Sequence, residues 1–132
     1  MLPDSLSEYD ITICLDGIVG DGAVNSTTGD LFIWDRALKN HLLLSERMQT
    51  EMFSPQSLID TITKTYYGYG EFIGENELGK CIKHSGSWPG YRNYLIRYIE
   101  EDLTIIVLSN NESDAKRISN ELAHNYFGRK PK

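Results

Sequence analysis

The amino-acid sequence predicts an α+β fold in which helices flank an antiparallel β-sheet. Two helical patterns come first, four strand-like runs separated by short turns follow, and a third helical pattern closes the chain. Strands joined in succession by short turns form antiparallel meanders, and helices segregated from them along the chain pack on the faces of the sheet. With 132 residues, of which 40% are hydrophobic, the chain has the size and composition of about one globular domain.

Two helices are predicted in the first half of the chain. Residues 28 to 39 carry apolar side chains at helical spacing, and Thr27 and Asp30 have the spacing of a capping box. The apolar residues are Leu31, Trp34 and Leu38. Ser45 is expected to cap a second helix that runs to about Phe53, because Ser-Pro follows and the residue before a proline disfavours the helical region.

Four strands are predicted over residues 66 to 110, whereas residues 56 to 65 are ambiguous. The strand-like runs are YYGYGEFIG, GKCIKHSGS, YRNYLIRYIEE and LTIIVLSNN. In the third run alternate side chains should point to opposite faces of the sheet, Tyr94, Ile96 and Tyr98 to one and Leu95 and Ile99 to the other. The fourth run is apolar on both faces from Leu103 to Leu108, so we expect it to be covered on two sides.

A last helix is predicted over residues 113 to 127, ended by Gly128. Its expected buried stripe is Ala115, Ile118, Leu122 and Tyr126. Ser113 would cap this helix, with Asp114 in its first turn and Lys116 in solvent. His124 is expected on the helix surface and His41 in a loop.

The formal net charge of -6 makes nucleic acid and anionic membrane surfaces poor candidates as partners. Cys14 and Cys81 are the only cysteines, and their wide spacing argues against a structural zinc site or a disulfide scaffold, so both are expected to be buried thiols. No targeting signal and no run of membrane-spanning length is visible in the sequence. We expect no metal and no cofactor.

Three short patterns have the form of catalytic motifs. Residues 113 to 116 fit S-x-x-K and residues 91 to 93 fit Y-x-N, but a helix cap and ordinary sheet positions explain them better. The third pattern is His84-Ser85-Gly86, which has the form of the K-T-G signature with histidine in place of lysine. Taken alone, His84 is better explained as a strand-end residue beside a turn.

The surroundings of this third pattern favour the catalytic interpretation. The stretches GDGAVNSTTGDLFIWDRAL, YYGYGEFI, HSGSWPGYRNYLIRY and LTIIVLSNN together resemble the C-terminal part of class C β-lactamase-like and penicillin-binding-protein-like serine hydrolases. The resemblance extends over roughly residues 17 to 127. It implies the C-terminal portion of the β-lactamase/transpeptidase-like fold, with an incomplete sheet and residues 1 to 132 forming a single partial domain.

The resemblance also implies roles for four residues of one strand. The backbone N–H of Ser87 would form half of an oxyanion hole, Gly86 would keep the approach open, and His84 would take the place of the lysine. Ser85 would hydrogen-bond the carboxylate or amide of a substrate if its side chain faces the cleft. Because only alternate side chains of a strand point to one face, the sequence alone does not decide whether Ser85 does so.

In the family, S-x-x-K and Y-x-N precede the K-T-G strand, whereas both lookalikes follow it in this chain. The nucleophile is therefore expected upstream of Met1, and the chain is expected to be an inactive fragment of a hydrolase acting on β-lactams, D-amino-acid peptides or esters. A non-catalytic binding module derived from the same fold is the alternative. The last strand should leave an unpaired apolar edge, which predicts self-association by edge pairing or element exchange. The resemblance also suggests a bacterial cell envelope or periplasm as the location.

Overall fold

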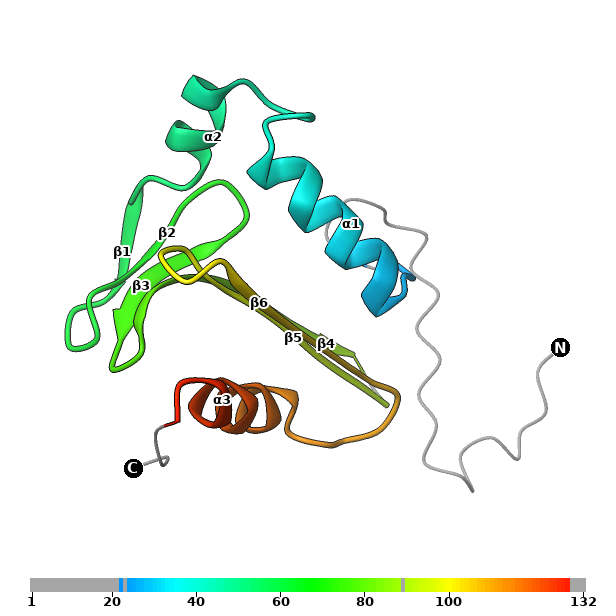
Figure 1. The fold of residues 1–132 in the computed structure, drawn as a ribbon. Coiled ribbons are helices and arrows are strands. Elements are labelled where there is room, and N and C mark those ends of the chain that lie inside the picture. The colour runs from blue at the N-terminus through cyan, green and yellow to red at the C-terminus, as the bar shows by residue number, and fades with distance from the viewer. Residues whose placement is uncertain (1–21, 23, 89, 129–132) are drawn as a thin grey trace, which may run out of the picture.

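The computed structural model of the chain describes residues 22, 24–88 and 90–128. They form a six-stranded antiparallel sheet with helices on both of its faces (Figure 1). The helices are α1 (Thr28–Lys39), α2 (Glu46–Met52) and α3 (Ala115–Tyr126), and the strands are β1 (Ser57–Asp60), β2 (Thr65–Tyr67), β3 (Phe72–Asn76), β4 (Gly79–Trp88), β5 (Tyr91–Tyr98) and β6 (Leu103–Ser109). Strand order in the sheet follows chain order, as a meander requires. The predicted α+β class is confirmed.

The first two helices begin where their capping residues predict. The side chain of Thr27 accepts a hydrogen bond from the backbone N–H of Asp30 at 3.1 Å, and that of Ser45 accepts one from Met48 at 3.4 Å. These bonds satisfy N–H groups that have no partner within a first helical turn. Both predicted helices are therefore present with nearly the predicted boundaries.

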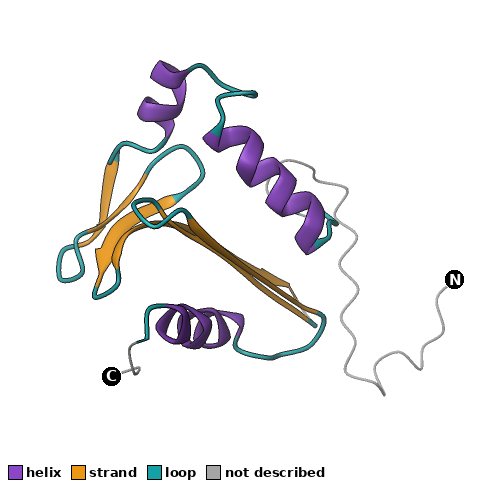
Figure 2. Ribbon diagram, viewed as in Figure 1, coloured by secondary structure: helices purple, strands orange, loops and turns teal. Residues whose placement is uncertain are grey.

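The sheet has two more strands than the four expected between residues 66 and 110. The ambiguous segment supplies β1, and the run YYGYGEFIG is two strands, β2 and β3, rather than one. The chain reverses within that run, where the N–H of Gly68 donates to the carbonyl oxygen of Glu71 at 2.8 Å. Figure 2 shows the resulting small strands β1 to β3 beside the longer strands β4 to β6.

The apolar core lies between the sheet and α3. Tyr94, Ile96 and Tyr98 of β5 are buried together with Cys81 of β4, so the predicted alternation and the predicted buried thiol of Cys81 are confirmed. Burial raises the pKa of the Cys81 thiol. Cys14 lies outside the described residues.

The buried face of α3 differs from the predicted stripe. Leu122 and Tyr126 are 49% and 64% exposed, and the side chains that α3 buries are Ala115, Ser119, Ala123 and His124. The small residues let the helix lie close to the bulky side chains of Tyr94, Ile96 and Tyr98 of β5, which a stripe of large side chains would not allow. The prediction that His124 lies on the surface was wrong. The N-cap is Asp114, whose side chain accepts from the N–H of Arg117, and not Ser113 as expected.

A buried ionic cluster joins α1 to the opposite face of the sheet. Asp35 is fully buried and forms an ion pair with Arg97 of β5, and it also accepts a hydrogen bond from Thr104 of β6 at 2.9 Å. Arg36 of α1 donates to the same carboxylate at 2.6 Å. Of the predicted apolar stripe of α1, only Leu38 is buried. Helix α1 is therefore held to the sheet largely by charged hydrogen bonds. Without Asp35, the buried guanidinium of Arg97 would lose its negatively charged partner, which would destabilise the fold.

Strand β6 has the two helix-covered faces that its apolar sequence predicts, with α1 over one side of the sheet and α3 over the other (Figure 1). Among the described residues it pairs with β5 alone, so its second edge has no strand beside it. None of the described helices is long and apolar enough to cross a membrane.

Candidate active site

The residues His84 to Ser87 lie in the second half of β4, where that strand loses one of its two neighbours. Strand β3 pairs with β4 only as far as the partners Phe72 and Lys83. Strand β5 continues to pair with β4 up to Trp88. The four residues are exposed and lie within the strand rather than at its end. Among the described residues they therefore form an open strand edge.

The direction of the backbone groups along this edge follows from one hydrogen bond. The N–H of Ile99 donates to the carbonyl oxygen of Lys80 at 3.2 Å, so Lys80 points its backbone polar groups toward β5. In an antiparallel pair this direction alternates with a period of two residues. His84 and Gly86 thus direct their N–H groups to β5, and Ser85 and Ser87 direct theirs to the open edge.

The side chains alternate in the same way. Ser85 lies across from the buried Tyr94 and Ser87 across from Arg92, so the two serines share one face of the sheet. His84 and Gly86 belong to the other face. A molecule at the open edge could reach the N–H groups of both serines whichever face their hydroxyls occupy.

The imidazole of His84 lies against two aromatic side chains. Its Nε2 is 3.2 Å from the hydroxyl oxygen of Tyr67, within hydrogen-bond distance. Its ring stacks on Phe72 with centroids 5.7 Å apart and planes 27° apart. Tyr67 and Phe72 contact each other edge to face at 4.8 Å. The histidine that the sequence singled out is therefore held from two sides.

The turn that carries these two aromatics is tightly built. A Cβ on Gly68 would lie 2.4 Å from the carbonyl oxygen of Met52 and 2.8 Å from Cδ1 of Ile73, so only glycine fits there. The N–H of Tyr69 donates to the same Met52 carbonyl at 3.2 Å. These contacts tie the turn between β2 and β3 to the end of α2.

Glu71, at the end of this turn, is a buried carboxyl group. It is 7% exposed, and its Oε2 has no hydrogen-bond partner among the described residues. Burial raises the pKa of Glu71 to about 7, although the positive charge of Arg97 acts in the opposite direction. The carboxyl group is therefore near its midpoint of ionisation at neutral pH, directly beside Phe72.

Gly86 has a side-chain neighbour across the strands in Asn93. A Cβ on Gly86 would lie 3.6 Å from Cβ of Asn93, which is ordinary van der Waals contact. The Oδ1 of Asn93 accepts a hydrogen bond from the N–H of Ser109 at 3.1 Å, and Tyr91 is 52% exposed. The Y-x-N lookalike thus consists of sheet residues.

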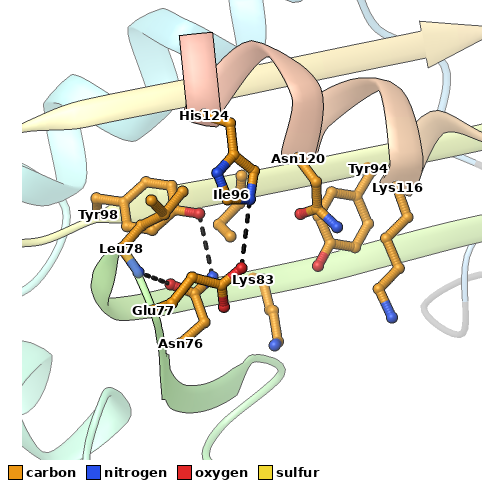
Figure 3. A pocket seen from close by; sticks show the side chains of 10 residues that line it. All are labelled: Asn76, Glu77, Leu78, Lys83, Tyr94, Ile96, Tyr98, Lys116, Asn120 and His124. Carbon is orange, nitrogen blue, oxygen red and sulfur yellow. Dashed lines mark hydrogen bonds and ion pairs between the residues drawn. The ribbon is translucent and has the colours of Figure 1, made fainter. Parts of the chain in front are cut away.

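In the part of the chain that the structure describes, Ser113 and Lys116 of the S-x-x-K lookalike share no hydrogen bond. Lys116 lines a cavity of about 180 Å³ between α3 and the sheet, and Ser113 does not. Figure 3 shows this cavity with the ion pair of His124 and Glu77, whose Nε2 and Oε1 are 3.3 Å apart. Tyr94 also lines it, and burial raises the pKa of its phenol to about 12. No residue from His84 to Ser87 lines this cavity.

No cluster of three or more histidine, cysteine, aspartate or glutamate side chains within the described ranges is placed to hold a metal ion. The chemistry that the β4 edge can supply is hydrogen-bond donation, from outward backbone N–H groups and from an imidazole.

Sequence reasoning identified this edge but missed Tyr67, Phe72 and Glu71. A signal was present, since YYGYGEFI contains two glycines between aromatic residues. Reading the run as two strands with a turn would have placed Tyr67 opposite Phe72, as the register has it.

Comparison with known proteins gives one family. Residues 2–125 match the family described as Beta-lactamase. A curated relative, penicillin-binding protein 4* of Bacillus subtilis (strain 168), is 44% identical over 117 residues. That alignment covers 88% of this chain and 26% of the relative, so the chain spans about a quarter of the relative's length.

Two solved structures share the fold. An octameric penicillin-binding protein homologue from Pyrococcus abyssi has a TM-score of 0.80 and 26% identity, over 87% of this chain and 27% of that one. A penicillin-binding protein from Bacillus halodurans has a TM-score of 0.66 and 24% identity, over 73% of this chain and 30% of that one.

Proposed function

The chain belongs to the β-lactamase family, and from this premise we propose that β4 forms one wall of an acyl-transfer site. The whole site would belong to a serine hydrolase that acts on β-lactams, D-amino-acid peptides or esters through an acyl-enzyme. One observation carries the proposal: the backbone N–H groups of Ser85 and Ser87 point to an open strand edge beside His84.

Each residue has a role at this wall. The N–H of Ser87 donates to the substrate oxygen that becomes negative in the tetrahedral intermediate, together with the N–H of the nucleophile. Gly86 keeps the strand free of a side chain where the substrate approaches, and His84 donates to the substrate from the position of the lysine in K-T-G. Ser85 hydrogen-bonds a carboxylate or amide of the substrate.

In this proposal the nucleophilic serine, its lysine and the catalytic tyrosine are supplied by sequence outside these 132 residues. The alignment with only 26% of penicillin-binding protein 4* supports this, as does the separation of Ser113 from the cavity that Lys116 lines. Because members of a catalytic unit act together, the chain by itself should have no measurable hydrolase activity.

A fluorescent penicillin and intact-mass analysis test the first part. The chain alone should form no adduct. A chimera in which this chain replaces its aligned region of penicillin-binding protein 4* should be labelled, and the matched Ser113→Ala chimera should be labelled equally well. An adduct on Ser113 of the isolated chain would overturn the proposal.

A proline at the proposed oxyanion position tests the second part. Ser87→Pro removes an N–H that makes no bond to β5, so the strand ladder is kept. In the chimera, loss of one oxyanion donor should slow acylation by about 100-fold to 1,000-fold. Circular dichroism checks that the variant is folded. Acylation of the folded variant at the unmodified rate would refute the role of Ser87 and favour a binding module without chemistry.

We also propose that the chain self-associates through the edge of β6 that no strand of the described residues covers. A strand edge without a partner can recruit a second chain, and the homologue from Pyrococcus abyssi is octameric. Light scattering should find a species larger than 15.0 kDa. Ile106→Lys, on this edge strand, should shift the distribution toward monomer, and a monodisperse monomer of the unaltered chain would contradict the proposal.

A further inference from the structure

Tyr67 and Phe72 form a clamp on His84, and we propose that this clamp fixes the imidazole in the tautomer that carries its proton on Nδ1. Tyr67 is thereby a positioning residue of the proposed acyl-transfer wall, on whose function this inference rests.

The chemistry of the two groups decides the direction of the hydrogen bond. The hydroxyl oxygen of Tyr67 and Nε2 of His84 are 3.2 Å apart. A phenol is an acidic O–H, whereas the unprotonated nitrogen of a neutral imidazole is an acceptor. Because a phenol is a better donor than acceptor towards an imidazole nitrogen, we infer that Tyr67 donates to Nε2, which places the proton of the neutral ring on Nδ1.

The stacking on Phe72 fixes the plane of the ring. With ring planes 27° apart and centroids 5.7 Å apart, rotation of the imidazole about χ2 would break the stack. Phe72 is itself held by the edge-to-face contact with Tyr67 at 4.8 Å. The ring of His84 thus has a preferred plane and a preferred tautomer before any substrate arrives.

The turn between β2 and β3 makes this arrangement rigid. Tyr67 and Phe72 are register partners, so the two strands present both rings to the same point of β4. The carbonyl oxygen of Tyr67 accepts from the N–H of Gln56 at 3.1 Å, and the crowding around Gly68 leaves the turn little freedom. In its neutral form the ring then carries its N–H donor at Nδ1, where the lysine of K-T-G would present a charged donor.

Long-range ¹H–¹⁵N spectra of the ¹⁵N-labelled chain read the tautomer directly. They are recorded at pH 8, above the ordinary histidine pKa of about 6.5, and His84→Gln identifies the signals among the three histidines. The two ring nitrogens should show the pattern of an Nδ1–H imidazole. A His84 ring that is mainly Nε2–H in the unaltered chain would overturn the proposal.

Tyr67→Phe keeps the aromatic ring and removes only the hydroxyl. The ratio of Nδ1–H to Nε2–H should fall by about fivefold, the factor that a hydrogen bond of about 1 kcal/mol produces. Tyr66→Phe, the same change at the neighbouring residue, should leave the ratio unchanged. Equal spectra for Tyr67→Phe and the unaltered chain, or an equal effect of Tyr66→Phe, would refute the role of Tyr67. Because the readout needs no catalysis, it is independent of whether the penicillin experiment succeeds.

Discussion

Replacing Glu71 by glutamine should change how the stability of this protein depends on pH. Its carboxyl group is buried at 7% exposure, its Oε2 has no hydrogen-bond partner in the described ranges, and its pKa is raised from 4.5 to about 7. At about 1.36 kcal/mol per pKa unit, this shift corresponds to about 3 kcal/mol. The folded state therefore holds the proton of Glu71 more tightly than the unfolded chain does.

The sign follows from proton linkage. Below pH 4.5 both states are protonated and the stabilisation is fully present; it is lost as the pH rises and is gone above about pH 7. Between pH 5 and pH 8 the free energy of unfolding should fall by about 2.5 kcal/mol through this one group. Glu71→Gln cannot ionise, so it should lack this part of the decrease.

Urea unfolding at pH 5 and pH 8 measures the difference. Other titrating groups contribute to both proteins and cancel when the unaltered chain and Glu71→Gln are compared. Glu75→Gln is the matched control, since it makes the same change at an exposed position of β3 and should follow the unaltered chain. If Glu71→Gln lost as much stability between the two pH values as the unaltered chain, the carboxyl group would already be ionised in the fold, and the reasoning from burial would be refuted.

Three further predictions concern the site and its supports. Amide hydrogen exchange followed by NMR should show slow exchange at Gly86 and fast exchange at Ser87; equal protection would mean that the N–H of Ser87 does not face the open edge. Asp35→Asn should lower the free energy of unfolding by about 3 to 5 kcal/mol, because Arg97 stays buried without its carboxylate. Asp102→Asn, at a half-exposed ion pair, should have a much smaller effect. Gly68→Ala should cost about 1 to 3 kcal/mol and weaken the contact of Tyr67 with His84, because the new Cβ would lie 2.4 Å from the Met52 carbonyl oxygen. The control Gly29→Ala, whose Cβ would have its nearest contact at 3.7 Å, should be nearly neutral. A thermal melt of Gly68→Ala like that of the unaltered chain would contradict the crowding.

Local signals in the sequence were sufficient for most of the elements. Thr27 and Ser45 identify the starts of α1 and α2, because capping depends on residues three positions apart. The alternation in β5 identifies the buried face of that strand, because the pleat has a period of two. Resemblance to a known motif pointed to residues His84 to Ser87. These residues lie in the part of β4 that pairs with β5 but no longer with β3.

Long-range packing decided what these local signals could not. The buried side of α3 is set by the large side chains of β5, so Ser119 and Ala123 face inward beside the predicted Ala115, although a periodic pattern favours Leu122 and Tyr126. The burial of Asp35 depends on Arg97, 62 residues away along the chain.

The amino-acid sequence by itself determined the three helices, the longer strands β4 to β6 and the strand on which the candidate site lies, because capping, pleat and turn preferences act over a few residues. Only the tertiary structure decided that Tyr67 and Phe72 close on His84 and that Glu71 is buried beside them. Those contacts join residues 12 or more positions apart, and their free energy comes from a three-dimensional arrangement that no local pattern encodes.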